Sequence, residues 1–127
     1  MLCPYTDDVD AAVADILSDI NNMVNIANTG YINSESSPGL GISMRIELAA
    51  AYEVAYNETG TTMSDDLNCI TNTGDGCLDD IHTQRTLWKA DQVALLTDDG
   101  SGLAWVSTDY EDQFSVTGRG NFNAHTF

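Results

Sequence analysis

The chain has 127 residues, and its 20 Asp and Glu against 4 Lys and Arg give a formal net charge of -16. This charge argues against nucleic-acid binding and against attraction to an anionic membrane surface, because both need clustered basic side chains. With 43% hydrophobic residues, the chain is predicted to fold around a core and not to remain a disordered acidic tail.

Residues 8–28 show the clearest helical pattern. Thr6 or Asp7 can cap such a helix at its start, and Gly30 lies where a terminating glycine is expected. We therefore predict one helix over 8–28. Its apolar face recurs at three- and four-residue steps and consists of Val9, Val13, Ile16, Leu17, Ile20, Met23 or Val24, and Ala27.

Residues 42–56 follow a different period, because every second side chain from Ile42 to Tyr56 is apolar. This alternation predicts one long strand, or two halves that meet at a bulge near residues 49–51.

Two short helices are predicted next. The first starts at Ser64 with Leu67 and Ile70 facing inward, and residues 72–76 end it. The second runs from about 77 to 89 and carries Leu78, Ile81, Arg85 and Trp88 on one stripe.

The last predicted elements are strands. Residues 93–96 form a continuous apolar run, which is typical of a central strand covered on both faces. Residues 102–106 and 114–117 indicate two shorter strands. The order of elements predicts an α/β fold with a mixed sheet.

The residues that most often hold metals or carry catalysis form no recognisable motif. His82 and His125 are the only imidazoles and are far apart in the sequence, so no His-x-x-x-His zinc pair exists. We expect His82 to be a hydrogen-bonded, partly buried histidine, and His125 lies near the end of the chain. Asn57-Glu58-Thr59 is a formal glycosylation acceptor, a pattern that is common by chance.

The three cysteines leave two alternatives open. Cys69 and Cys77 are eight positions apart across the predicted break between the two short helices, where a disulfide can close. They can equally be two unpaired thiols. Cys3 is then unpaired or joined to a partner that this chain does not contain, and the absence of Cys-x-x-Cys argues against redox catalysis.

The ordered motifs, taken together, resemble the N-terminal subdomain of a metzincin zinc metallopeptidase of the reprolysin-like, secreted bacterial type. The similarity covers nearly the whole chain. The motifs that carry it are Tyr5-Thr6 before a helix, the alternating residues 42–56 followed by Asn57-Glu58-Thr59-Gly60, the helix pair around Leu67 and Asp75-Gly76-Cys77-Leu78-Asp79-Asp80-Ile81-His82, then Ala90-Asp91-Gln92-Val93-Ala94-Leu95-Leu96, Gly102-Leu103-Ala104-Trp105, Phe114-Ser115-Val116 and finally Asn121-Phe122-Asn123-Ala124-His125-Thr126-Phe127.

This resemblance implies a mostly parallel, twisted mixed sheet flanked by helices, the upper subdomain of a metzincin-like catalytic domain, with residues 1–127 as a single partial domain. The family's His-Glu-x-x-His-x-x-Gly-x-x-His motif is expected where the sequence stops at Phe127. The resemblance therefore implies zinc in a longer parent enzyme, no catalytic or metal residue in this chain, and no activity of this piece alone. The family's first strand would have to come from residues 1–5, where Pro4 leaves a gap in the ladder, so both ends are expected to be cut.

The resemblance assigns one role to residues that are present. In metzincins an antiparallel edge strand pairs with an extended peptide or protein substrate, and the matching positions here are Gly102, Leu103, Ala104, Trp105 and Val106. The alternative is an ordinary short edge strand with a core Trp. We expect a secreted, monomeric parent protein whose signal peptide is not in this chain, and the alternative function is a self-contained, non-catalytic acidic binding module.

Overall fold

The computed structural model describes residues 1–35, 41, 43–98, 101–107 and 109–119, so the expectations for His125 and for the motif at 121–127 lie outside the described residues. One five-stranded sheet organises the fold, with the strand order β2-β1-β3-β5-β4. All neighbouring strands are parallel except β4, which is antiparallel to β5. The predicted mixed, mostly parallel α/β sheet is confirmed. The strands are β1 (Leu2–Thr6), β2 (Ala50–Val54), β3 (Val93–Thr97), β4 (Gly102–Ala104) and β5 (Phe114–Gly118).

The strand β1 forms in the interior of the sheet despite Pro4. Its pairing with β3 is at Leu2 and Tyr5, on either side of the proline, while its whole length is in register with β2. The gap that Pro4 was expected to leave in the ladder therefore does not prevent a first strand. The missing N–H interrupts one ladder locally, and the remaining pairs on both sides hold the strand.

The predicted single helix over 8–28 is two helices, α1 (Asp7–Ala12) and α2 (Ile16–Glu35). The Asp15 carboxylate accepts a hydrogen bond from the Ser18 N–H (3.1 Å), which is the geometry of a new N-cap. Val13 accordingly has an extended backbone, with φ -128° and ψ 129°. The helix α2 also continues through Gly30, which does not terminate it, and Leu17 is half-exposed instead of facing the core.

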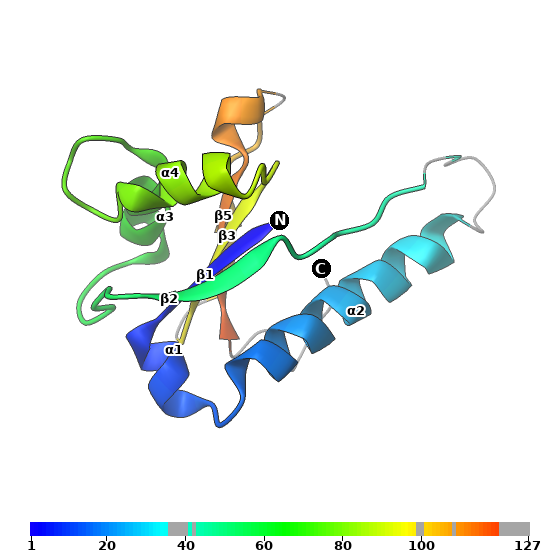
Figure 1. Cartoon of the computed structure of the whole chain (residues 1–127), viewed down its shortest axis with the longest axis horizontal. Helices are drawn as coiled ribbons and strands as arrows, with labels where there is room; N and C mark the ends of the chain where they lie inside the picture. Colours follow the sequence, from blue (N-terminus) through cyan, green and yellow to red (C-terminus); the bar gives the residue numbers. More distant parts are fainter. Residues whose placement is uncertain (36–40, 42, 99–100, 108, 120–127) are drawn as a thin grey trace.

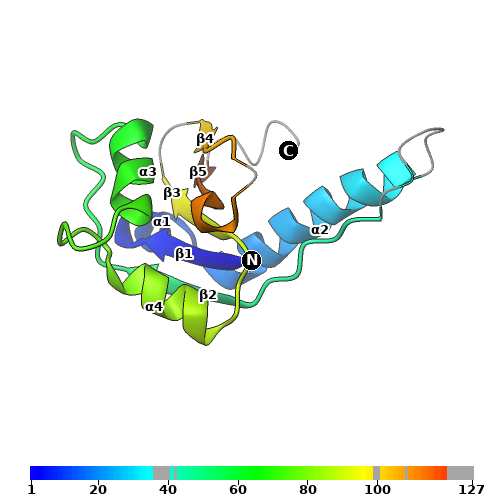
Figure 2. The ribbon, with the colours of Figure 1, turned by 90° about the horizontal axis from the view of Figure 1, so that it is seen from above.

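The long strand expected over 42–56 is only the short strand β2. The segment before it runs beside α2 (Figure 2), and its backbone is bound there by the Asn28 side chain. The Asn28 amide donates to the Ile46 carbonyl (2.9 Å) and accepts from the Ile46 N–H (2.7 Å). The Asn28 amide thus satisfies the backbone groups of Ile46 that a neighbouring strand would otherwise bind. The alternating side chains of this segment are only partly covered, since Met44 is 48% exposed.

The two short helices are α3 (Met63–Thr71) and α4 (Asp80–Leu87), and a single turn of 3-10 helix, η1 (Tyr110–Asp112), precedes β5. A capping box between Thr62 and Asp65 starts α3, as its Thr-x-x-Asp pattern allows. The helix α4 is shorter than the predicted 77–89, and Trp88, expected on its inward stripe, is 49% exposed.

The helices cover both faces of the sheet, with α1 and α2 on one side and α3 and α4 on the other (Figure 1). Each side has its own core: Leu67, Ile70, Ile81, Phe114 and Val116 belong to the α3/α4 side, and Val9, Ile16, Ile20, Met23 and Leu96 to the α1/α2 side. The strand β3 is buried at four of its five positions, as its continuous apolar run predicts. Among the described residues, no helix is long and apolar enough to cross a membrane.

Candidate functional site

The strand β4 forms one edge of the sheet. It pairs with β5 in the register Gly102 with Thr117, Leu103 with Val116, and Ala104 with Ser115. Two hydrogen bonds continue the ladder past its ends: the Gly118 N–H donates to the Ser101 carbonyl (2.9 Å), and the Trp105 N–H donates to the Phe114 carbonyl (3.4 Å).

This ladder determines which backbone groups of β4 face away from the sheet. In an antiparallel strand the N–H and C=O of successive residues point alternately to the two sides. The Ser101 C=O and the Trp105 N–H both point toward β5, so the backbone groups of Leu103, midway between them, do so as well. The N–H and C=O groups of Gly102 and Ala104 then point outward. Within the described residues, no further strand pairs with this side of β4.

The edge also presents apolar side chains to solvent. Leu103 is 40% exposed, Trp105 is 44% exposed, and Val106 just beyond them is fully exposed. Leu103 lies opposite the buried Val116, and Trp105 is two residues further on, so both side chains are on the face that α3 covers. The alternative with a core Trp does not fit a half-exposed indole. An exposed apolar edge strand is normally protected or used for strand addition.

The helix α3 is bound to both ends of this edge. The Trp105 indole N–H donates to the hydroxyl of Thr71, the last residue of α3 (2.8 Å). At the first turn of α3, the Met63 sulfur accepts from the Ser101 N–H (3.0 Å). Sequence reasoning missed Thr71 and Met63, and no local signal marks them, because each contacts a residue more than thirty positions away.

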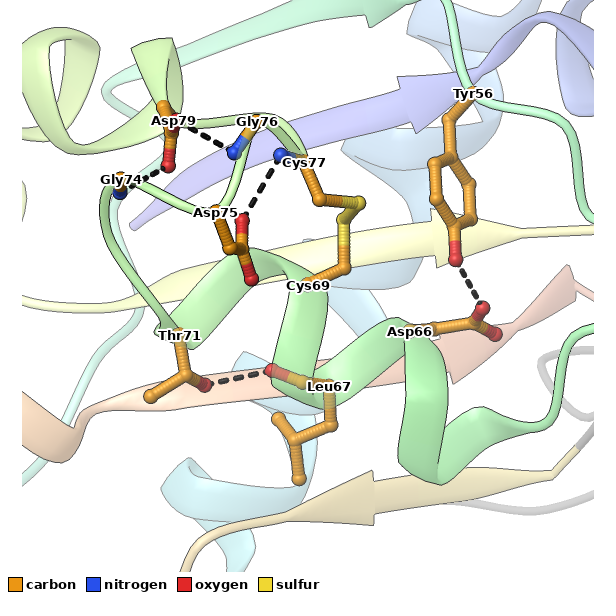
Figure 3. Close-up of a disulfide and its surroundings, with 10 residues drawn as sticks. All are labelled: Tyr56, Asp66, Leu67, Cys69, Thr71, Gly74, Asp75, Gly76, Cys77 and Asp79. Carbon is orange, nitrogen blue, oxygen red and sulfur yellow. Dashed lines mark hydrogen bonds between the residues drawn. A yellow bond between two sulfur atoms is a disulfide. The ribbon is translucent and has the colours of Figure 1, made fainter.

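Cys69 in α3 and Cys77 in the following loop are joined by a disulfide, with their Cα atoms 5.2 Å apart (Figure 3). The loop between them is ordered by carboxylates. Asp79 accepts from the N–H groups of Gly74 (2.7 Å) and Gly76 (3.0 Å), and both glycines have positive φ. The last turn of α3 is therefore fixed from outside the helix as well as from within it.

The remaining polar groups near the ends of the strands are engaged in structural contacts. Glu58, the middle residue of the glycosylation-like motif, accepts from the Thr6 hydroxyl and, through both carboxylate oxygens, from the Asp98 N–H (3.0 Å each). Asp98 in turn forms an ion pair with Arg119 (2.7 Å). This network joins the ends of β1, β3 and β5 and accounts for Glu58 without a catalytic role.

Neither His82 nor Cys3 is placed for chemistry. The Nε2 atom of His82 is buried without a hydrogen-bond partner among the described residues, so the expected hydrogen-bonded histidine was wrong in this respect. Its ring packs on Phe114, with the ring centroids 5.2 Å apart. Burial raises the pKa of the Cys3 thiol to about 12, which makes it a poor nucleophile.

Across the described residues, no group of three or more His, Cys, Asp or Glu side chains could hold a metal ion. The residues described here therefore do not fit the zinc that the family resemblance implies, and no catalytic step can be assigned to them.

The mostly parallel, five-stranded α/β sheet is consistent with a metallopeptidase subdomain, and comparison with known proteins agrees. The model of the family described as "Metallo-peptidase family M12B Reprolysin-like" matches residues 1–125. The chain belongs to this family, as its ordered motifs predicted.

Two curated relatives are both described as peptidyl-Asp metalloendopeptidases. The protein of Stenotrophomonas maltophilia is 35% identical over 100 residues, which cover 74% of this chain and 22% of the relative. The protein of Xanthomonas campestris pv. campestris is 35% identical over 80 residues, which cover 61% of this chain and 18% of the relative. The chain thus spans about a fifth of the length of these relatives.

A solved structure described as a chaperone-substrate complex has the same fold. It superposes with a TM-score of 0.70 at 17% identity and covers 98% of this chain and 23% of that chain. At this identity the likeness concerns the fold alone.

Proposed function

We propose that this chain is the N-terminal part of a secreted, zinc-dependent metalloendopeptidase, in which it supplies the sheet and an edge strand that binds the substrate. The observation that carries the proposal is the side of β4 on which no strand pairs among the described residues, where Gly102 and Ala104 direct their N–H and C=O groups outward. An extended peptide can pair with these groups as an added strand. Family membership supports the choice of a peptide as the ligand.

Zinc and the residues that act on the scissile bond belong, in this proposal, to a part of the parent protein other than the described residues. Residues 1–127 alone are expected to bind no stoichiometric zinc and to cleave no protein. The whole reading frame around this chain is expected to bind one zinc and to cleave casein, and a chelator should abolish the cleavage. A reading frame without a zinc-binding motif would favour the non-catalytic binding module.

The extracellular location and the substrate are parts of the same proposal. The Cys69–Cys77 disulfide supports an oxidising compartment, since disulfides persist mainly outside the cytosol. The name of the two relatives suggests peptides that contain Asp. Cleavage of Asp peptides should be compared with cleavage of matched Asn peptides, and equal rates would contradict this substrate class.

The edge strand can be tested by removing one outward N–H. Ala104→Pro deletes an N–H that the sheet does not use, so the fold should tolerate it, since prolines are accepted where an edge strand faces solvent. In the full-length protein we expect kcat/KM for an extended peptide to fall about five- to tenfold, which corresponds to one lost hydrogen bond. Ala104→Val keeps the N–H and adds similar bulk, so it should retain activity close to that of the unmutated protein.

A second measurement leaves the protein unchanged. Strand addition uses every second N–H of the substrate on one side, so N-methylation at successive peptide positions should impair cleavage at alternating positions. Sensitivity without alternation, together with an unimpaired Ala104→Pro variant, would show that β4 does not bind the substrate.

A further inference from the structure

The hydroxyl of Thr71 has only one arrangement that satisfies both of its hydrogen bonds. It donates its single hydrogen to the Leu67 carbonyl (2.7 Å), one turn earlier in α3, as Figure 3 shows. Its lone pairs are then left to accept, and the Trp105 indole N–H donates to it (2.8 Å). The helix therefore fixes the direction of the acceptor that the indole meets.

The backbone and the side chain of Trp105 are consequently held by different elements. Its N–H is bound to the Phe114 carbonyl of β5, and its indole is bound to α3. The indole is still 44% exposed, and the 40% exposed Leu103 lies on the same face of β4. Together these two side chains make an apolar strip beside the outward backbone groups of the edge.

We propose that Thr71 is a positioning residue for this edge: its hydroxyl orients the Trp105 indole, and the oriented indole selects apolar side chains in a peptide paired with β4. The inference rests on the proposed function, because it concerns a peptide bound as an added strand. The side chains of such a peptide alternate between the two faces, so one of them lies beside Leu103 and Trp105. An apolar side chain there removes apolar surface from water, whereas a charged one gains no partner from the strip.

The rest of α3 supports this role of Thr71. The Cys69–Cys77 disulfide is two residues before Thr71 and fixes the same turn. At the other end of the helix, the Met63 sulfur accepts from the Ser101 N–H and so keeps β4 aligned with α3. Since the disulfide, the helix and the strand are connected in this way, a small change at the Thr71 hydroxyl affects the indole without disturbing the sheet.

The test uses the full-length protein and a positional-scanning peptide library, which locates the position where Leu or Phe is preferred. Thr71→Val has nearly the same shape but lacks the hydroxyl, and we expect the preference at that position to fall about fivefold, the equivalent of one hydrogen bond. Thr71→Ser keeps the hydroxyl and should restore the preference. The fluorescence of Trp105, obtained in the full-length protein by subtracting the spectrum of a Trp105→Phe variant, should shift to longer wavelength and be quenched more by acrylamide in Thr71→Val.

Thermal stability separates the positioning role from a purely structural one. If Thr71 only positions the indole, the melting temperature of Thr71→Val should stay within about 2 °C of the unmutated protein, because the indole is half-exposed and water can replace the lost acceptor. Thr86→Val is the matched control, because the Thr86 hydroxyl makes the same kind of bond to the His82 carbonyl (3.0 Å) but lies on α4. It should change neither selectivity nor fluorescence.

The possible failures are distinguishable. An unchanged preference and unchanged fluorescence in Thr71→Val, no rescue by Thr71→Ser, or an equal effect of Thr86→Val would each overturn the positioning role. So would a large loss of thermal stability in Thr71→Val, which would assign the hydroxyl to the fold. If Ala104→Pro cleaves extended peptides normally and N-methylation shows no alternation, β4 does not bind the substrate, whatever Thr71 does.

Discussion

Removal of the Cys69–Cys77 disulfide should destabilise the chain by an amount that follows from its loop length. The two cysteines are separated by 8 positions. For a loop of this size, the chain-entropy estimate of the stabilisation is about 2.5 kcal/mol at 25 °C. Replacing both residues by Ala, which leaves no buried hydroxyl, removes this contribution. For a domain of this length the loss corresponds to a fall of about 9 °C in melting temperature.

The assay compares thermal unfolding of the unmutated chain and the double Ala variant, each with and without a reductant. The reductant should lower the melting temperature of the unmutated chain to nearly that of the variant, and it should leave the variant unchanged. A fall of less than about 3 °C in the variant, or no response of the unmutated chain to reductant, would refute the entropy reasoning.

The same disulfide has a chemical readout. The chain has three cysteines, so alkylation after denaturation without reductant should label Cys3 alone, and alkylation after reduction should label all three. Three labels without reduction would show two free thiols at positions 69 and 77.

Three further predictions concern buried polar groups. Tyr56→Phe removes a hydrogen bond from the tyrosine hydroxyl to Asp66 (2.6 Å), and because Asp66 is only 5% exposed, we expect a loss of about 1–3 kcal/mol in urea unfolding; less than about 0.5 kcal/mol would contradict this. Burial raises the pKa of the Cys3 thiol from 9.0 to about 12, so on raising the pH the thiol ionises first in the unfolded chain. The free energy of unfolding should therefore fall as the pH rises from about 9 to about 12. A Cys3→Ala variant whose stability falls equally steeply over this range would contradict the prediction. Arg85 is 6% exposed, donates to three backbone carbonyls and lies over the Phe114 ring (4.9 Å). Arg85→Met should therefore lower the free energy of unfolding by about 3 kcal/mol or more, and Arg85→Lys should recover only part of this loss. Full recovery by Arg85→Lys would show that the charge alone matters.

The local features of the fold could be predicted where neighbouring residues in the sequence decide them. The continuous apolar run at 93–96 lies in an interior strand, and Leu67 and Ile70 face inward from α3. The same local reasoning failed at Val13, where an apolar pattern continued through a helix break. The break is made by Asp15, which caps α2 through the Ser18 N–H. Asp15 is a local N-cap residue, but the apolar period runs on through it and therefore predicts a single helix.

The alternation over residues 42–56 failed for another reason. A period of two shows that one side of a segment is buried, but it does not show what accepts its backbone hydrogen bonds. For Ile46 the Asn28 side chain on α2 is that partner, and for Glu47 and Ala49 it is the backbone of Met1. No reading of the segment alone contains this information.

The sequence by itself determined the class of the fold and the family, because these depend on composition, local period and an ordered set of motifs. It also predicted a strand over 102–106, of which only Gly102–Ala104 form β4. Only the tertiary structure decided that Gly102 and Ala104 are the residues whose backbone faces outward, since this follows from the register between β4 and β5. It alone also brought Thr71 to the Trp105 indole. Such contacts join residues far apart in the chain, and they exist only once the order of the strands and the place of α3 are fixed.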